Sequence, residues 1–187
     1  MAKINVKFKK LSQDAKLPKY AHKGDLGMDV ISTSLEYDAE TDTYIYGTGL
    51  ACETKNGVGI LGMVRSSNYK TDSYLTNGVG LIDSALYRGE IQLRYKNRTS
   101  MNARIELDTL RAWSMIPWYK KIFTSYKNVY KKIKEHYMLN ALQFAPYSLG
   151  MRCGQLVILE FPETSIKNAK KLSETERGEG GFGSTKM

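Results

Sequence analysis

Short apolar runs and alternating apolar and polar residues predict β-strands in most of the chain outside its third quarter. The candidate strands lie at residues 4–8, 44–46, 58–64, 91–95 and 156–161. Gly, Asn and Asp are frequent between them, as expected of tight turns. Together with 16 glycines, these short elements indicate an all-β sandwich or jelly roll.

Residues 98–147 do not follow this pattern. From Tyr119 onward the apolar positions recur at helical spacing, at Ile122, Tyr126, Val129, Ile133 and Tyr137. Pro117 precedes them and suits a first helical turn, where its missing N–H group costs nothing. We therefore expect a helix from about Trp118 to Leu142, roughly 36 Å long. This helix would be an insertion into the β domain.

The chain is accordingly expected to have three parts. A single β domain would comprise residues 1–97 and 148–176, and a basic, aromatic helical insertion would comprise residues 98–147. Residues 177–187 would form a flexible C-terminal lid, because glycine-rich termini are mobile unless a ligand or partner holds them.

The composition is that of a globular protein, with 42% hydrophobic and 25% charged residues and a net charge of +9. The insertion holds nine Lys or Arg against three Asp or Glu, which favours a polyanionic partner. No apolar run approaches the ~20 residues that a membrane span needs. Cys52 and Cys153 are too few for a disulfide framework and lack metal-ligand spacing. We expect a cytoplasmic protein that makes no use of a membrane.

The glycine-rich segment from Arg177 to Thr185 is a candidate phosphate clamp. Its glycines let the backbone approach phosphate oxygens, and an arginine can contact phosphate through two N–H groups. A P-loop is excluded, because Ser184 stands where that motif needs lysine and no helix can follow. The ring of Phe182 could stack on a base. A disordered end remains the alternative from composition alone.

Three further segments carry candidate chemistry. Arg65-Ser66-Ser67 follows an apolar strand and makes a plausible anion site, although an ordinary loop is the simpler interpretation. The stretch 77–89 is expected to be a β-hairpin region. Its Asp83 could orient or deprotonate a water, or merely cap a turn. Asp29 could contact Mg²⁺ on a triphosphate.

In this order, five segments resemble the five motifs of the trimeric dUTPase family (deoxyuridine 5'-triphosphate nucleotidohydrolases). They are 21–30, 65–67, 77–89, 150–155 and 175–185. The resemblance implies a jelly-roll β-barrel in a homotrimer with active sites shared between subunits. It also implies hydrolysis of dUTP to dUMP and pyrophosphate, with Mg²⁺ bound to the triphosphate. Some bacteriophage dUTPases carry extra segments near this insertion, which suggests a phage member acting in a bacterial or phage-infected cell.

The resemblance also implies a role for each matching residue. Asp83 would activate the water that attacks the α-phosphorus, Asp29 would meet the metal through water, and Tyr87 would pack under the deoxyribose. The residues expected to hold uracil and the phosphates are Arg65, Ser66, Ser67, Asn77, Gly80, Ile82, Gln155, Arg177, Phe182, Gly183, Ser184 and Thr185. The third motif departs from the family, because Asp83-Ser-Ala-Leu-Tyr87 has one extra residue and lacks a second carboxylate.

Two alternatives stay open. The related dCTP deaminase activity would need additional acid–base residues for chemistry at C4, and no such pair is apparent. A regulatory or nucleic-acid-binding module would keep the fold and use the insertion. The insertion itself either packs its Ile122, Tyr126 and Ile133 face on the β domain or provides a docking surface for a protein or nucleic acid.

Overall fold

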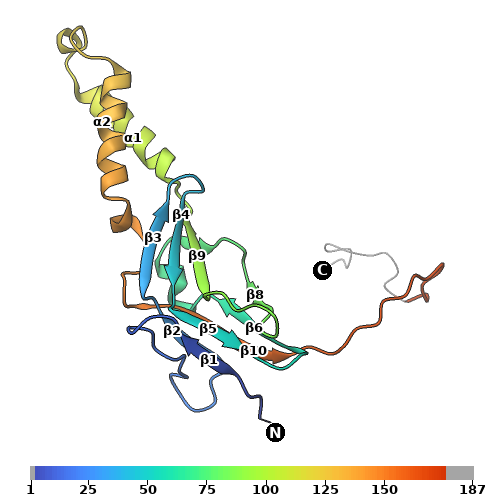
Figure 1. The fold of residues 1–187 in the computed structure, drawn as a ribbon. Coiled ribbons are helices and arrows are strands. Elements are labelled where there is room, and N and C mark those ends of the chain that lie inside the picture. Colours follow the sequence, from blue (N-terminus) through green and yellow to red (C-terminus); the bar gives the residue numbers. More distant parts are fainter. Residues whose placement is uncertain (1–2, 176–187) are drawn as a thin grey trace.

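The computed structural model describes residues 3–175, and its main body consists of two four-stranded antiparallel sheets (Figure 1). One sheet has the strand order β2-β10-β6-β8 and the other β3-β4-β9-β7, while β1 and β5 form a separate ribbon. The strands are β1 Lys7–Lys10, β2 Gly27–Ile31, β3 Ser34–Asp38, β4 Thr43–Gly47, β5 Leu50–Glu53, β6 Val58–Met63, β7 Ser73–Leu75, β8 Gly80–Ile82, β9 Gln92–Asn97 and β10 Arg152–Glu160.

Buried side chains of both sheets meet in one core. Tyr46 of β4 and Tyr95 of β9 point inward, with ring centroids 5.6 Å apart in an edge-to-face arrangement. They join Ile60 and Leu156 from the other sheet. The hydroxyl of Tyr46 donates to the carbonyl of Tyr147 at 2.8 Å, so its burial leaves no unpaired polar group. This double-sheet arrangement confirms the predicted jelly roll.

Most predicted strands are present, with two differences. The first strand begins at Lys7, three residues later than its apolar alternation indicated. The hairpin predicted at 77–89 is wrong: β8 pairs with β6, whereas β9 pairs with β4 and β7. The segment therefore crosses from one sheet to the other, since the strand before its turn joins β6 and the strand after it joins β4 and β7.

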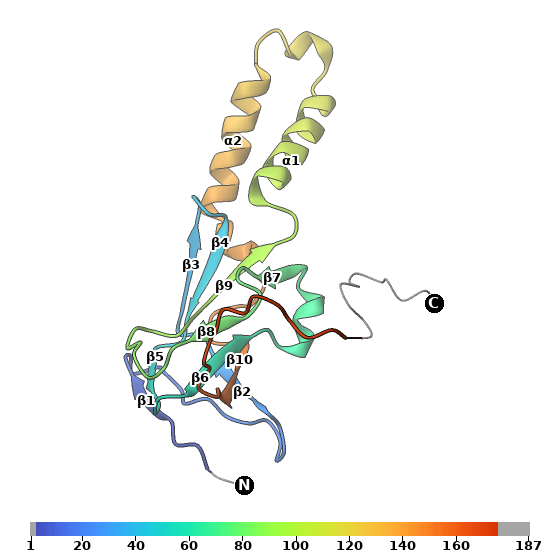
Figure 2. The same cartoon turned by 90° about the vertical axis from the view of Figure 1, so that its right-hand side faces the viewer.

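The insertion is helical, as predicted, but it contains two helices. α1 Met101–Met115 and α2 Tyr126–Leu139 pack side by side as a hairpin that projects from the β body (Figures 1 and 2). Short 3-10 turns lie at Trp118–Lys120 at the far end and Ala141–Phe144 at the base. No helix in residues 3–175 is both long and apolar enough to cross a membrane.

The single helix predicted from Trp118 to Leu142 is therefore wrong. The side chain of Ser125 accepts a hydrogen bond from the Asn128 N–H group, which starts α2 there. Pro117 follows the end of α1 and does not begin α2. α1 has its own sequence signal, since Ser100 caps it and Met101 and Ile105 are buried four residues apart.

The helices pack mainly on each other, which corrects the expectation that one helical face covers the β domain. Ile122 is largely exposed at the far end. Tyr126 packs edge-to-face against Trp113 of α1, with ring centroids 5.9 Å apart. Ile133 joins a small second core, which contacts the β domain only near the base of the hairpin, where Tyr37 takes part.

Candidate active site

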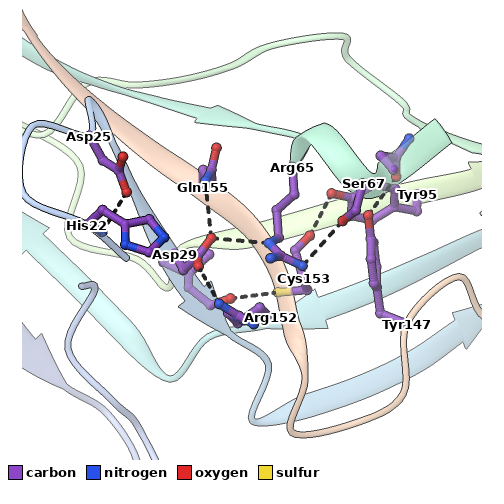
Figure 3. A network of polar contacts seen from close by, with 12 residues as sticks. His22, Asp25, Asp29, Arg65, Ser67, Tyr95, Tyr147, Arg152, Cys153 and Gln155 are labelled. Atoms are coloured by element: carbon purple, nitrogen blue, oxygen red, sulfur yellow. Dashed lines mark hydrogen bonds and ion pairs between the residues drawn. The ribbon is translucent and has the colours of Figure 1, made fainter. Parts of the chain in front are cut away.

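Strand β10 brings together residues that are far apart in the sequence. It lies between β2 and β6, and Gln155 is in register with Asp29 on one side and with Met63 on the other. Arg65 follows the end of β6, and Arg152 begins β10. The side chains of Asp29, Arg65, Arg152 and Gln155 therefore converge at one end of this sheet (Figure 3). We call these four residues the Asp29 cluster.

The cluster is held by hydrogen bonds to both carboxylate oxygens of Asp29. Oδ1 accepts from Arg65 Nε at 3.2 Å and from Gln155 Nε2 at 3.2 Å. Oδ2 accepts from Arg152 Nη1 at 3.1 Å. The Asp29 side chain is 9% exposed, whereas that of Arg152 is 54% exposed. Two guanidinium groups against one carboxylate leave a positive charge, which suits a phosphate.

A glycine of the first motif makes room for this arrangement. A Cβ added at Gly27 would lie 3.0 Å from Gln155 Oε1, so a larger residue there would require the Gln155 side chain to shift. Ser66 and Ser67 lie in the 3-10 turn Ser66–Lys70, next to Arg65. Arg65 Nη1 donates to Ser67 Oγ at 3.4 Å, while Ser66 is exposed.

The turn after Arg65 is fixed by Asn68 and Tyr147, two residues that the sequence did not identify. Tyr147 Oη donates to Asn68 Oδ1 at 2.8 Å, and Asn68 Nδ2 donates to the Ser73 carbonyl at 2.8 Å. Tyr147 is buried, and burial raises the pKa of its hydroxyl. The bond joins the end of the insertion to the turn that carries Ser66 and Ser67.

The third-motif residues form a second group. Asn77, Gly80, Ile82, Asp83 and Tyr87 line one pocket of about 340 Å³, together with Glu90 and Arg94. None of the residues in the Asp29 cluster lines this pocket. A single chain thus presents two separate groups of candidate residues.

Asp83 projects from a turn that is anchored at the next residue. Ser84 is buried, and its Oγ lies 2.6 Å from Thr54 Oγ1 and donates to the Val58 carbonyl. The Asp83 carbonyl accepts from the Tyr87 N–H at 2.8 Å. Its side chain is exposed, and within residues 3–175 its carboxylate has no hydrogen bond or ion pair. The carboxylate is therefore held in place and accessible.

The longer turn before Tyr87 folds the ring back over Gly89. A Cβ at Gly89 would lie 2.3 Å from Tyr87 Oη, so only glycine allows this ring position. Tyr87 Oη donates to the Glu90 carbonyl at 3.2 Å. The extra residue is thus accommodated by a closed turn, and Tyr87 stays at the pocket.

The residues described do not form a ready-made metal site. No group of three or more His, Cys, Asp or Glu side chains within residues 3–175 could hold a metal ion. Both oxygens of Asp29 already accept from guanidinium or amide groups, so direct ligation by Asp29 does not fit. The remaining residues of the predicted site, Arg177, Phe182, Gly183, Ser184 and Thr185, lie outside the described residues.

Comparisons with known proteins agree with the fold. No protein-family model matches the chain. Deoxyuridine 5'-triphosphate nucleotidohydrolases of Clostridium tetani and Clostridioides difficile are each 29% identical to it. The alignments cover 99% of both chains in the first case and 97% in the second. These relatives match from end to end, including the region of the insertion.

Solved structures of phage enzymes share the fold. The dUTPase of Staphylococcus bacteriophage 80alpha, solved with dUPNHPP, superposes with a TM-score of 0.63 at 20% identity and covers 98% of this chain and 99% of its own. The dUTPase of phage phi11 of S. aureus, described with a species-specific insert, gives 0.55 at 16% identity, with 91% and 99% covered. The chain is thus similar over its full length to curated dUTPases, and it shares its fold with the phage dUTPases.

Proposed function

We propose that this chain hydrolyses dUTP to dUMP and pyrophosphate. The observation that carries the proposal is the pairing of a cationic cluster around Asp29 with an accessible carboxylate, Asp83, at a separate pocket. The cationic cluster can bind a triphosphate, and the carboxylate of Asp83 can accept a proton from a water nucleophile. The full-length relatives carry the name of this activity.

Asp83 accepts a proton from a water molecule as the water oxygen attacks the α-phosphorus. The new P–O bond makes dUMP, and the bond to the β-phosphate oxygen breaks, so pyrophosphate leaves. Positioning and charge stabilisation supply most of the rate enhancement in such reactions. The anchored Ser84 supports this role, because it limits the positions that the Asp83 carboxylate can adopt.

Arg65 and Gln155 hold the phosphates together with Ser66 and Ser67. Mg²⁺ bound to the triphosphate would screen its charge, and Asp29 would meet the ion through water and not as a direct ligand. A dUTPase structure from phage phi11 is described as coordinating a structural Mg(II) ion. Arg177, Phe182, Gly183, Ser184 and Thr185 would close over the bound nucleotide.

Asn77 and Gly80 bind the edge of the uracil base in the pocket that Asp83 lines, with the backbone at Ile82 beside them. Tyr87 packs under the deoxyribose. The two groups of residues are separate in one chain, which favours a homotrimer in which one subunit supplies the phosphate residues and another supplies Asp83. We place this activity in the cytoplasm of a bacterial or phage-infected cell.

The two helices of the insertion have no part in this chemistry, and we propose that they serve as a docking surface. The exposed side chains at their far end favour this role over added stability alone. The partner would be a protein or a nucleic acid, and dUTP hydrolysis does not depend on it.

The direct test is pyrophosphate release from dUTP, dCTP, dTTP and UTP, with and without Mg²⁺. We expect release from dUTP, at least about a hundredfold slower release from the other three, and a requirement for the metal. Conversion of dCTP to dUTP without pyrophosphate release would instead identify a deaminase. A folded protein that turns over none of them would refute the proposal.

A further inference from the structure

The far end of the insertion exposes aromatic and aliphatic side chains to solvent. We call residues 115–125 the tip; it lies at the end of the hairpin away from the β body (Figure 2). Trp118 is 78% exposed and Phe123 is 88% exposed, while Tyr119 and Ile122 are exposed beside them. Exposed apolar groups that cluster in this way mark an interaction surface.

A row of lysines leads away from the tip along α2. Lys127, Lys131 and Lys134 are spaced by four and three residues, so they lie on one helical face, and all three are exposed. We call them the lysine stripe. It spans roughly 10 Å along the helix axis. The stripe begins at Lys127, two residues after the end of the tip.

Carboxylates of the hairpin do not neutralise this stripe. Glu106 accepts from Tyr126 Oη at 2.6 Å, and Asp108 accepts from Tyr137 Oη and from Arg111. Glu135 is the remaining acidic residue of the two helices. Within residues 3–175, none of the stripe lysines has an ion pair. Their charges are therefore available to a partner.

We infer that the hairpin binds single-stranded nucleic acid, with phosphates along the lysine stripe and bases stacked on Trp118, Tyr119 and Phe123. Single strands offer both features at once, because their phosphates are regularly spaced and their base faces are open for stacking. A duplex hides those faces. This inference specifies the partner of the docking role proposed above and is independent of dUTP hydrolysis.

The direction of the stripe separates this partner from a lipid surface. A membrane that met the tip would lie across the hairpin axis, whereas the stripe runs along that axis. Lys134 lies about 10 Å further from the tip than Lys127 and would contribute little there. A polyanionic strand lying along the hairpin contacts the whole stripe and the rings together.

The test uses the full-length protein and a labelled single strand of about 12 nucleotides, made of deoxyadenosine and deoxycytidine so that a uracil pocket does not hold it. Fluorescence anisotropy measures binding at several salt concentrations, with the same sequence as a duplex for comparison. We expect the single strand to bind at least about tenfold more tightly than the duplex.

Two variants separate charge from stacking. Lys127→Glu with Lys131→Glu should weaken single-strand binding by at least about tenfold and reduce the slope of log K against log salt by about 1.4. The matched control, Lys167→Glu with Lys170→Glu, makes the same charge change elsewhere and should change affinity less than about twofold. Trp118→Ala with Phe123→Ala should weaken binding by about tenfold and leave the slope unchanged.

Circular dichroism and dUTP turnover show that each variant is folded, and neither readout is expected to change. Equal binding of duplex and single strand, insensitive to the ring variant, would overturn the inference in favour of a nonspecific cationic surface. Binding to vesicles with anionic lipid in the absence of single-strand binding would overturn it in favour of a membrane. A protein partner that requires the tip, again without single-strand binding, would also overturn it.

Discussion

Asp29 Oδ1 accepts a hydrogen bond from Arg65 Nε at 3.2 Å, an ion pair that joins β2 to the turn after β6. The same carboxylate accepts from Arg152 and Gln155. A carboxylate occupied in this way acts first as an organiser of phosphate-binding groups. Its negative charge keeps two guanidinium groups close together, which their mutual repulsion would otherwise oppose.

Asp29→Asn tests this role. The amide keeps one acceptor oxygen but turns an N–H₂ group toward a guanidinium donor. We expect KM for dUTP to rise by about tenfold and the free energy of unfolding to fall by about 1–3 kcal/mol, since two partly exposed arginines lose their partner. Steady-state kinetics and urea unfolding measure these changes. Asp25→Asn in the loop before β2 is the control, and equal effects in both variants would contradict the assignment.

The bond between Tyr147 and Asn68 predicts a separable contribution to binding. Tyr147→Phe removes the hydroxyl that holds the turn carrying Ser66 and Ser67. We expect KM to rise by about threefold to tenfold, with kcat nearly unchanged, because a net hydrogen bond contributes about 0.5–1.5 kcal/mol. A fall in kcat of the same size, with KM unchanged, would contradict a role of this turn in phosphate binding.

Excision of the two helices should leave dUTP hydrolysis intact if the hydrogen bond between Tyr147 and Asn68 is kept. Asn97 Nδ2 donates to the Phe144 carbonyl at 2.8 Å, so the ends of the insertion are already close. Replacing residues 99–142 by a short Gly-Ser linker should leave dUTP turnover within about threefold of the full chain. Extending the deletion through Tyr147 should raise KM, as Tyr147→Phe does. Loss of turnover in the shorter deletion would show that the helices serve catalysis.

Sugar discrimination should depend on Gly89, which the ring of Tyr87 covers. Gly89→Ala displaces that ring and should lower the ratio of kcat/KM for dUTP over UTP by about tenfold. Tyr87→Phe keeps the ring, removes only the bond to the Glu90 carbonyl, and should change the ratio less. If both variants discriminate like the parent, Tyr87 does not select the sugar.

The buried thiol of Cys153 predicts how stability changes with pH. Burial raises its pKa from 9.0 to about 12. The folded state thus keeps the proton, so the stabilisation is complete below pH 9 and is lost as the pH rises toward 12. Between these values the slope is about 1.4 kcal/mol per pH unit for this group. Urea unfolding measures the fall in the free energy of unfolding between pH 8 and pH 10, and this fall should be smaller in Cys153→Ala than in the parent protein. Equal falls in the two proteins would contradict the prediction.

The sequence predicted the parts of this fold that depend on local patterns. The apolar runs of β6 and β10 and the helical spacing of α2 are visible directly, and the capping Ser100 and Ser125 could have separated the two helices. The pairing of β8 with β6 could not be derived, because it depends on which sheet the strand Gly80–Ile82 joins. Local alternation carries no information about that choice.

In the site, too, the sequence predicted the local motifs but not the contacts between distant residues. The resemblance identified Arg65, Gln155 and Asp83, but the contacts that position them join distant parts of the chain. Asn68 and Tyr147 are separated by 79 positions, and neither belongs to a matching motif. Arg152 stands within the fourth motif, yet only the strand register places it at Asp29.

The most direct test of the account is a comparison of Asp83→Asn with the parent protein in dUTP turnover and dUTP binding. Asparagine keeps the size of the side chain and cannot take the proton of the attacking water. We predict that turnover falls by at least about a thousandfold, while the dissociation constant for dUTP, measured by calorimetry, stays within about threefold. Turnover near that of the parent, in a folded protein that binds dUTP, would contradict it.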